Sequence, residues 1–457
     1  MEREVTLLEM LQAREARAMA QQAIMEELGL PVISFCLNIA GPVKNGPVLR
    51  RAFRTGLEAL EDALAGAGIR VVQHHQVDEV TGCEALWAVQ GEGRRVKEVC
   101  AALEDGHPLG RLWDLDVLDP QRGKWDREDL GLPPRRCLVC GKEGKGCASR
   151  RLHSLEELRS ATEKILKGYF KPHDAARLGA QAARALLYEV CTTPKPGLVD
   201  RANNGSHRDM DLFTFLDSTA ALAPYFEEAV TLGQETANLP PEETFRRLRQ
   251  AGMAGERAMF QATGGINTHK GAVFSLGTLC AAAGRLWKPE GPCGDAQALL
   301  ETCGDMARAA VQADFAAMEQ GGADTAGRRF YLQYGLRGIR GEVADGLPSV
   351  LKISLPTLER EMAKGATLEQ AGARTLCALM AQVTDTNLLS RGGEEGSRWA
   401  REQAENLCRK KGGPSTEELE QLDQAFIAQN LSPGGCADLL AITYFLWFCR
   451  EQQDAFF

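Results

Sequence analysis

The amino-acid sequence predicts a two-domain protein, with an N-terminal α/β domain over residues 1–172 and an all-α, multi-helix domain over residues 173–457. Three observations support this prediction. The 457 residues exceed the usual domain size of about 100–200 residues. Helical and strand patterns alternate along the first 150 residues. After Leu178, alternating strand patterns are almost absent.

The N-terminal domain is expected to interleave helices with strands. Apolar residues that recur every three to four positions indicate the helices, and short β-branched or aromatic runs indicate the strands. The expected helices cover residues 4–28, 47–65 and 94–103, and the expected strands cover residues 32–37, 69–77, 85–89 and 111–118.

A change of pattern follows at the capping-box sequence Ser154-Leu155-Glu156-Glu157, which is expected to open a helix that runs to about Phe170. The tripeptide Lys171-Pro172-His173 is expected to end that helix, because proline disrupts helix interiors. From Leu178 onward only helices are expected. They cover residues 178–191, 211–233, 241–261, 268–286, 294–320, 357–364, 368–383, 397–411, 415–428 and 433–450.

Composition and charge exclude several classes of protein. Hydrophobic residues make up 44% and charged residues 25% of the chain, which is ordinary for a globular protein. The net charge of −9 argues against nucleic-acid binding, which needs a basic surface. The first residues lack a signal-peptide pattern, and the apolar run 439–448 is too short to span a membrane. We therefore expect a cytoplasmic protein whose 14 cysteines are mostly reduced.

The expected strand at residues 111–118 carries two aspartates. Its apolar residues point to one face, so Asp114 and Asp116 would lie side by side on the other. Two such carboxylates repel each other unless a cation lies between them, and Mg²⁺ binds carboxylates together with substrate phosphates. Nucleotidyl transfer uses this arrangement. The alternative is a pair of solvated aspartates at a sheet edge.

Several motifs around this strand resemble a known family. They are the turn Asn38–Lys44, the stretch His107–Leu118 and the segment Arg136–Cys140, with Ala40 departing from an expected proline. Residues 1–170 resemble apo-citrate-lyase phosphoribosyl-dephospho-CoA transferase, also called holo-citrate-lyase synthase. The resemblance implies a nucleotidyltransferase-like domain. In it, a serine hydroxyl of an acyl carrier protein attacks the α-phosphate of a triphosphoribosyl group, and pyrophosphate leaves.

The same resemblance assigns roles to individual residues. By the resemblance, Asp114 and Asp116 would hold Mg²⁺. By residue type and position, Lys44 and Arg111 are candidate substrate ligands. A third metal-binding carboxylate is not identified by the sequence pattern. Its candidates are Asp78, Glu79 and Glu84.

A cysteine-rich pattern follows the aspartate strand. Cys137, Cys140, Cys147 and His153 are spaced Cys-x2-Cys-x6-Cys-x5-His, and the first pair has the spacing of zinc ligands. Nearby Arg and Lys residues would stabilise thiolates. The second half has no standard pairing, so ordinary reduced thiols are the alternative to a structural zinc site. The basic residues could instead hold the phosphates of a CoA-like group or an acidic carrier protein.

Four polar loops interrupt the expected helices of the C-terminal domain. In residues 192–211, two prolines fix the position of Lys195, and His207, Asp209 and Asp211 lead into a helix. If that helix begins near His207, then His207 and Asp211 share a face. Helix capping is the simpler role for an acidic residue here.

The other three loops combine cations, amides and carboxylates. The glycine-rich loop 263–271 opens a helix, and the free N–H groups there favour an anion. Residues 335–342 place two arginines between glycines, which suits phosphate binding. Residues 384–393 bring Asp, Asn and Arg into one break between helices. The candidate residues are Asn267, His269, Lys270, Arg337, Arg340, Asp385, Asn387 and Arg391.

These loops carry a second, more specific resemblance, which runs from about Leu178 to the C-terminus. Lys195–Asp200, Gly205–Asp211, Gly265–Gly271, Arg337–Gly341 and Asp385–Gly393 are similar to motifs of triphosphoribosyl-dephospho-CoA synthase. The resemblance implies that ATP loses adenine while its triphosphoribosyl unit is joined to the 2′-hydroxyl of 3′-dephospho-CoA. Because an N-glycosidic bond breaks, positive charge builds on the sugar. The site therefore needs a base, a donor for adenine, and a cationic or Mg²⁺ clamp on the triphosphate.

Residue type suggests three groups of side chains for this reaction. The carboxylates for metal and base roles are Asp209, Asp211 and Asp385. The phosphate clamp consists of Lys195, Lys270, Arg337, Arg340 and Arg391. The residues that orient the substrate are His207, His269, Asn267 and Asn387.

The two resemblances together predict a bifunctional enzyme that makes the prosthetic group of citrate lyase and attaches it. The expected partners are the acyl carrier (gamma) subunit of citrate lyase and small nucleotides, without nucleic acid or membrane. Two alternatives remain. The same chemistry could serve malonate decarboxylase, or the N-terminal domain could be a zinc-bearing module that docks the carrier without catalysis.

Overall fold

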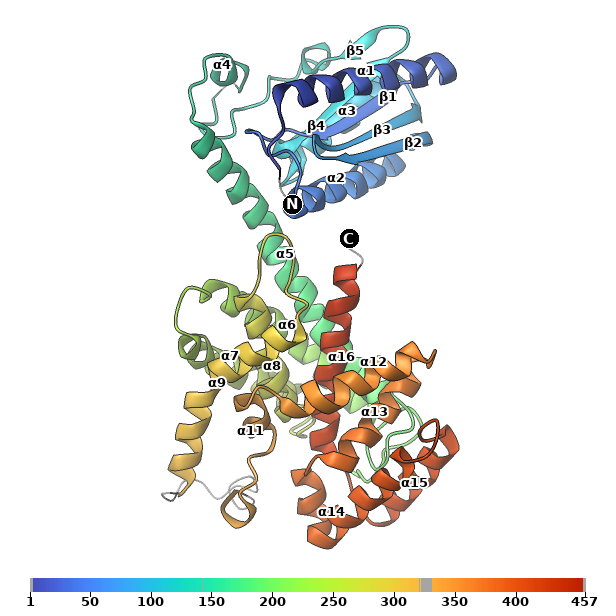
Figure 1. The fold of residues 1–457 in the computed structure, drawn as a ribbon, viewed down its shortest axis with the longest axis vertical. Helices are drawn as coiled ribbons and strands as arrows, with labels where there is room; N and C mark the ends of the chain where they lie inside the picture. The colour runs from blue at the N-terminus through green and yellow to red at the C-terminus, as the bar shows by residue number, and fades with distance from the viewer. Residues whose placement is uncertain (1–2, 143, 320, 322–330, 455–457) are drawn as a thin grey trace. The chain divides into compact units, whose positions relative to one another are not determined.

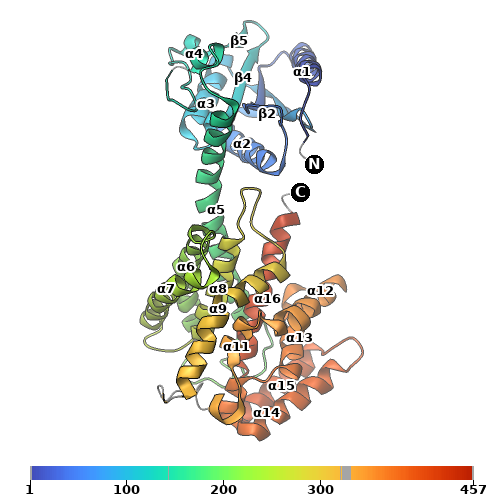
Figure 2. The ribbon, with the colours of Figure 1, turned by 60° about the vertical axis from the view of Figure 1, so that its left-hand side comes forward.

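The computed structural model describes residues 3–142, 144–319, 321 and 331–454. The chain divides into two compact units, Met1–Lys171 and Pro172–Phe457 (Figure 1, Figure 2). Unit 1 combines helices with a sheet, whereas unit 2 is built from helices. Each unit is described by itself below.

Unit 1 contains a five-stranded sheet in the order β2-β3-β1-β4-β5. All neighbouring strands run antiparallel, so this sheet is not the parallel type that alternating helices and strands often build. The strands expected from the sequence are present, and a short fifth strand follows them. Their bounds are Val32–Leu37 (β1), Arg70–Glu79 (β2), Gly82–Gln90 (β3), Trp113–Asp119 (β4) and Gly123–Trp125 (β5).

Helices cover both faces of this sheet. Helix α1 (Leu7–Leu28) packs Ile24 against Val32 and Ala88 on one face. On the other face, α2 (Pro47–Gly66) and α3 (Gly93–Gly106) cover the aromatic core around Phe35. Gly56 of α2 permits this packing, since a Cβ there would lie 2.4 Å from the Phe35 ring. A short helix α4 (Gly144–Ser149) lies in the cysteine-rich segment.

Helix α5 corrects one expectation. It runs from Leu155 to Cys191 with Pro172 inside it, so Lys171-Pro172-His173 does not end the helix. The proline removes the hydrogen bond to the carbonyl of Gly168, an exposed residue without a side chain, which gives the ring room and leaves the carbonyl open to water. Apolar side chains before and after the proline, including Phe170 and Leu178, are buried and hold the helix together.

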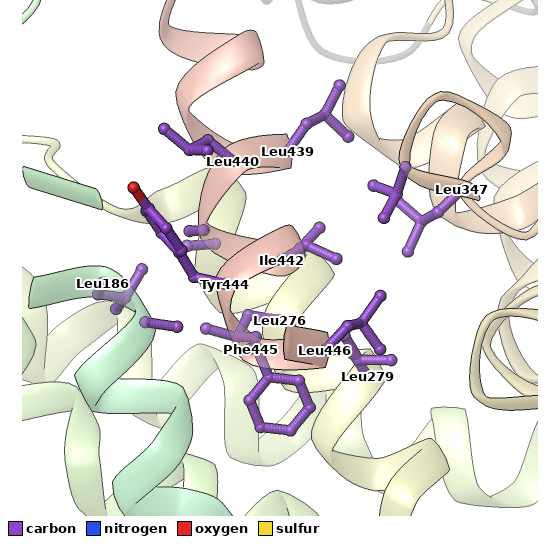
Figure 3. Packing of buried hydrophobic residues seen from close by; sticks show 14 of the residues in the cluster. Leu186, Leu276, Leu279, Leu347, Leu439, Leu440, Ile442, Tyr444, Phe445 and Leu446 are labelled. Carbon is purple, nitrogen blue, oxygen red and sulfur yellow. The ribbon is translucent and has the colours of Figure 1, made fainter. Parts of the chain in front are cut away.

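Unit 2 packs its helices around one apolar core. Helix α16 (Gly434–Asp454) carries the apolar run at its centre, and Figure 3 shows Ile442 and Phe445 among leucines of neighbouring helices, including Leu186 and Leu276. The expectation that this run is a buried core helix is confirmed. Among the described residues, every helix is too short or too polar to cross a membrane.

The remaining helices of unit 2 agree with the expected ranges to within a few residues, with two differences. A helix and a π-turn occupy Gly338–Ala344 (α11) and Val350–Ser354, where loop was expected. Helix α14 starts at Thr386, not near residue 397, because a kink at Gly393 joins two helical pieces. The bounds not yet given are α6 (Leu212–Glu235), α7 (Pro241–Ala262), α8 (Lys270–Arg285), α9 (Ala296–Glu319), α12 (Leu355–Ala363), α13 (Leu368–Gln382), α14 (Thr386–Cys408) and α15 (Thr416–Ala428).

Candidate functional site

The aspartate pair of unit 1 lies on β4, beside the central strand β1. The antiparallel register places Asp114 opposite Cys36 and Asp116 opposite Ser34. The expected alternation is confirmed, because Trp113, Leu115 and Val117 are buried while both aspartates remain partly exposed. The two carboxylates therefore share one open face of the sheet.

A pocket of about 730 Å³ opens over this face, within the size range of small-molecule sites. Cations surround the pair: the Lys124 ammonium lies 2.8 Å from Asp116, and the Arg135 guanidinium lies 3.9 Å from Asp114. Burial and the neighbouring charge of Asp116 raise the pKa of Asp114. A divalent cation would relieve this repulsion, and the carboxylate donors are the type that Mg²⁺ prefers.

Two lining residues that the sequence pattern missed build the inner wall of this pocket. Glu104 of α3 is buried and accepts a hydrogen bond of 2.9 Å from the Leu115 amide. Lys97, two turns earlier in the same helix, donates to the Leu115 carbonyl at 2.7 Å. Both hold the aspartate strand by its backbone. Only contacts across the folded chain reveal them, since neither stands in a polar motif.

The other predicted substrate ligands of unit 1 are placed differently. Arg111 lines the pocket, and its guanidinium donates to the Arg136 carbonyl at 2.7 Å. Lys44 instead donates to the Ile39 carbonyl within its own turn, at 2.5 Å, and lies outside the pocket lining. It closes the turn and does not point a free ammonium at a ligand.

The three candidates for a further metal-binding carboxylate also lie outside the lining of this pocket, as far as the structure describes it. Asp78 accepts a hydrogen bond from Asn45 and pairs with Arg50. Glu84 pairs with Arg17 of α1 at 2.7 Å. The carboxylates that do line the pocket with the aspartate pair are Glu104, Asp126 and Glu128.

The cysteine-rich segment forms another wall of the same pocket. Cys137, Cys147 and His153 line it, and Cys140 lies beside them. The three sulfur atoms and a ring nitrogen all lie within 4.8 Å of one another. These donors could hold a metal ion.

In unit 2, Lys195 is a buried residue that is already paired. Its side chain is 1% exposed and its ammonium donates to the Glu189 carboxylate of α5. The loop around it is fixed by Asp423, which accepts hydrogen bonds of 2.8 Å from the Gly197 amide and the Asn203 side chain. The sequence pattern indicated Lys195 but missed its partner Glu189.

The same loop brings His207 next to Arg391, which belongs to the polar segment 384–393. The His207 ring lies 2.9 Å from the Ser432 hydroxyl and 3.2 Å from the Arg391 guanidinium. Arg391 also donates to the Ser206 carbonyl at 2.9 Å. Burial and the charge of Arg391 lower the pKa of His207, so the ring is neutral at pH 7.

Asp209 and Asp211 are exposed at this point of the fold. Asp211 is the N-cap of α6 and accepts a hydrogen bond of 2.9 Å from the Thr214 amide. The helix starts at Leu212, so His207 and Asp211 do not form the helical pair that a start near His207 would give. Capping accounts for the position of Asp211.

His269 is the buried member of the glycine-rich loop. The Thr268 hydroxyl donates to Ser218 at 2.7 Å, and Ser218 lies 2.7 Å from His269 Nδ1. Ser218 can then donate to Nδ1, which places the ring proton on Nε2. This Nε2 atom is buried without a hydrogen-bond partner in the described part of the chain. Burial and the charge of Lys195 lower the pKa of His269 to about 3.

Its neighbours in that loop face water. Asn267 and Lys270 are exposed, and the Lys270 ammonium lies 3.1 Å from Glu256.

Asp385 and Arg337 share a smaller pocket of about 270 Å³. Asp385 is buried, caps α14 and accepts a hydrogen bond of 2.8 Å from the Cys436 amide. Arg337 pairs with Asp345. Arg340 points elsewhere, toward Asp314 at 3.5 Å, while Asn387 packs beside Gly434.

A second residue that the sequence pattern missed connects these loops. Asp438 lies on α16, next to the glycine-rich loop: a Cβ on Gly271 would lie 1.9 Å from its carboxylate. Burial and the charges of Glu189 and Asp385 raise its pKa well above the usual value. Asp438 therefore stands between the Lys195, His269 and Asp385 segments. It lies in the apolar α16 helix, so no polar motif marks it.

Comparisons with known proteins match both units. Residues 5–169 match the family apo-citrate lyase phosphoribosyl-dephospho-CoA transferase, CitX. Residues 175–456 match ATP:dephospho-CoA triphosphoribosyl transferase, CitG.

Full-length relatives have the same order. Protein CitXG of Leuconostoc mesenteroides subsp. cremoris is 35% identical, over 97% of each chain. Protein CitXG of Haemophilus influenzae is 35% identical, over 96% of each chain. A 2-(5''-triphosphoribosyl)-3'-dephosphocoenzyme-A synthase of Klebsiella pneumoniae is 42% identical over 60% of this chain and 92% of its own. The sequence-based identification of both halves is confirmed, and the chain belongs to the CitXG family, in which a CitX domain precedes a CitG domain.

Proposed function

We propose that the two units catalyse successive steps in making and attaching the prosthetic group of citrate lyase. Unit 2 joins the triphosphoribosyl unit of ATP to the 2′-hydroxyl of 3′-dephospho-CoA and releases adenine. Unit 1 transfers the product to a serine of the apo acyl carrier protein and releases pyrophosphate. Family membership supports both reactions, and the product of one is the substrate of the other.

The observation that carries the unit 1 assignment is the Asp114–Asp116 pair beneath a pocket rich in cations. We assign the pocket a nucleotidyltransferase role, with Mg²⁺ held by the two carboxylates. When bound, the metal would supply positive charge to the phosphates. Arg111 and Arg135 line the same pocket and suit the triphosphate by charge and geometry. Lys124, which pairs with Asp116, would give way to the metal.

In unit 2 we propose that the site lies where the Lys195, His269 and Asp385 segments meet α16. The neutral ring of His269 presents a buried Nε2 donor, which suits the nitrogen of departing adenine. Asp438 lies beside the glycine-rich loop, and its carboxylate, when ionised, can accept the proton of the 2′-hydroxyl and pass it to the departing adenine. The C1′–N9 bond of ATP breaks, the C1′–O2′ bond forms, and adenine leaves with a proton.

The phosphate contacts of this site come from the remaining cations. Arg391, with the neutral ring of His207 beside it, forms one group, and Arg337 lines the pocket beside Asp385. Lys270, Asn267, Asn387 and Arg340 keep their proposed substrate roles, which depend on a bound nucleotide. Asp209 keeps its proposed role as a carboxylate for metal or base chemistry. Asp211 is proposed only as a helix cap.

A single experiment tests the proposal. The full chain is incubated with ATP, Mg²⁺, 3′-dephospho-CoA and the apo acyl carrier protein, and mass spectrometry follows adenine, the triphosphoribosylated CoA and the modified carrier. We expect all three. Omitting the carrier should leave the first two unchanged. Modification of an apo malonate decarboxylase carrier in preference to that of citrate lyase would change the assigned partner.

Two variants assign the steps to residues. Asp438→Asn should stop adenine release while leaving carrier modification intact when the triphosphoribosylated CoA is supplied. Asp114→Ala should do the reverse. If pyrophosphate release is unchanged in Asp114→Ala, unit 1 is a docking module and its transferase role is wrong.

A further inference from the structure

The cysteine-rich wall of the unit 1 pocket has the donors of a transition-metal site. Cys137, Cys140, Cys147 and His153 each offer one ligand atom, and all four atoms lie within 4.8 Å of one another. The Cys140 and Cys147 sulfur atoms are 3.5 Å apart. A disulfide requires about 2.0 Å, whereas sulfur ligands about 2.3 Å from a tetrahedral zinc lie nearly 4 Å from each other. The spacing therefore fits shared coordination better than a disulfide.

The backbone around the first two cysteines supports the same conclusion. The Gly141 amide donates to the Cys137 carbonyl at 3.1 Å, and Gly141 has the positive φ of 69° that the tight turn requires. The Cys137 amide donates to the Lys142 carbonyl at 2.6 Å and closes the same turn. The turn therefore holds Cys137 and Cys140 close together, as two ligands of one ion must be.

An independent observation concerns the fourth donor. The Nε2 atom of His153 is buried, yet it has no hydrogen-bond partner in the described residues. A buried ring nitrogen without a partner is costly, and coordination of a metal would satisfy it. Three thiolates and one neutral imidazole leave one negative charge around a divalent ion, and the neighbouring Arg135, Arg136 and Arg150 balance it.

We propose that Cys137, Cys140, Cys147 and His153 bind one Zn²⁺ ion, which holds Arg135 and Arg136 against the aspartate strand. All four ligand positions are taken by the protein, so the site is structural and does not activate water. The ion replaces the thiol protons of the cysteines, which pass to solvent.

The contacts of the two arginines show what the zinc site positions. Arg135 donates to the carbonyls of Trp113 and Gly110, both at 2.7 Å, and reaches Asp114. The Arg136 carbonyl accepts from Arg111. Because these residues precede Cys137 directly, an ordered turn at the cysteines fixes the cationic side of the pocket.

The test uses the full chain, purified without chelator, and measures all first-row metals by plasma mass spectrometry. We expect about one zinc per chain. Replacing zinc by cobalt(II) should give a thiolate-to-cobalt charge-transfer band. Less than about a tenth of an equivalent of zinc with no uptake on addition, or iron in its place, would overturn the proposal. A Cys140–Cys147 disulfide found by peptide mapping would also overturn it.

Variants separate metal binding from loss of folding. Cys140 is exposed, so Cys140→Ser should fold but lose most of the zinc and the cobalt band. Cys140→His should keep both, because imidazole is also a zinc ligand. The matched control is Cys293→Ser in unit 2, which should keep the full zinc content. Retention of zinc in Cys140→Ser would contradict the assignment.

The two enzymatic activities provide a second measurement, separate from the metal analysis. Cys140→Ser should weaken carrier modification by unit 1 and leave adenine release by unit 2 unchanged. The proposed function would fail differently, by absence of both activities in the zinc-loaded wild-type chain.

Discussion

The aspartate pair of unit 1 and the Lys195–Glu189 pair of unit 2 lie in opposite environments. In unit 1 the aspartate pair faces a large pocket, with Asp114 and Asp116 partly exposed and cations beside both carboxylates. In unit 2 the Lys195–Glu189 pair is almost fully buried. An open site can exchange its cations for a metal and substrate phosphates, whereas a buried one is arranged before the substrate arrives. The aspartate pair of unit 1 is therefore suited to the ligand binding that we propose for it, whereas the Lys195–Glu189 pair organises a loop of unit 2.

The largest expected effect is the loss of stability when the buried Lys195–Glu189 pair is broken. Lys195→Met leaves Glu189 as an unpaired buried charge and should lower the free energy of unfolding of unit 2 by about 3–5 kcal/mol. Urea unfolding followed by circular dichroism measures this. The matched control is Lys124→Met in unit 1, whose partner Asp116 is partly exposed and which should cost about 1 kcal/mol or less. Equal costs would show that the two environments do not differ as described.

Recovery in a double variant sharpens this test. Glu189→Gln combined with Lys195→Met removes both charges, so most of the lost stability should return.

Substitutions in the aspartate pair of unit 1 should lower its activity without lowering its stability. Asp114→Asn should slow pyrophosphate release by on the order of 10²–10³-fold, the usual cost of removing a group that stabilises transition-state charge. Adenine release should not change. Asp105→Asn, which alters an exposed carboxylate paired with Arg127, is the control and should keep both activities. Loss of adenine release in Asp114→Asn would contradict the division of labour between the units.

The buried histidine of unit 2 predicts a pH dependence. The pKa of His269 is lowered to about 3, so below its ordinary value of 6.5 the unfolded chain binds a proton that the folded chain does not. Stability should therefore fall by about 1.4 kcal/mol for each pH unit between pH 6.5 and about 3, and this group should add no pH dependence above 6.5. Urea titrations at several pH values measure the slope. His269→Gln should lose this part of the slope, and an unchanged slope would be inconsistent with the burial of the ring.

The smallest expected effect concerns Asp211, the exposed helix cap. Asp211→Ala removes the acceptor of the Thr214 amide and should lower the melting temperature of unit 2 by about 2–4 °C. Adenine release should remain close to that of the wild type. Asp211→Ser, which keeps a capping oxygen, should restore the melting temperature. A large loss of adenine release in both variants would show that Asp211 has a metal or base role in the reaction.

The sequence predicted which side chains of unit 1 lie together where their arrangement is local. Alternation along one strand places Asp114 and Asp116 on one face, and the cysteine and histidine donors lie close together in the sequence as well as in the structure. The pattern could not show that Lys44 would turn back to the Ile39 carbonyl. Nor could it find Glu104, whose role depends on α3 packing against β4.

In unit 2 the sequence predicted the helices and the polar loops, but not how the loops meet. Glu189 stands within a long helix and Asp438 within an apolar one, so neither belongs to a polar motif. Their positions depend on packing between helices that are far apart in the sequence. The sequence also indicated a stop at Pro172, because a local rule cannot weigh the apolar residues buried on each side of it.

The continuous helix α5 determines how the chain can be divided. A cut at the junction of the two units, between Lys171 and Pro172, gives two helical pieces, each of which keeps its own buried apolar side chains. Proline tolerates the first turn of a helix, so the second piece would begin with a residue suited to a new N-terminus. The residue that was expected to break the helix thus marks the boundary of the two units, and it is the position at which we would divide the chain to express each unit separately.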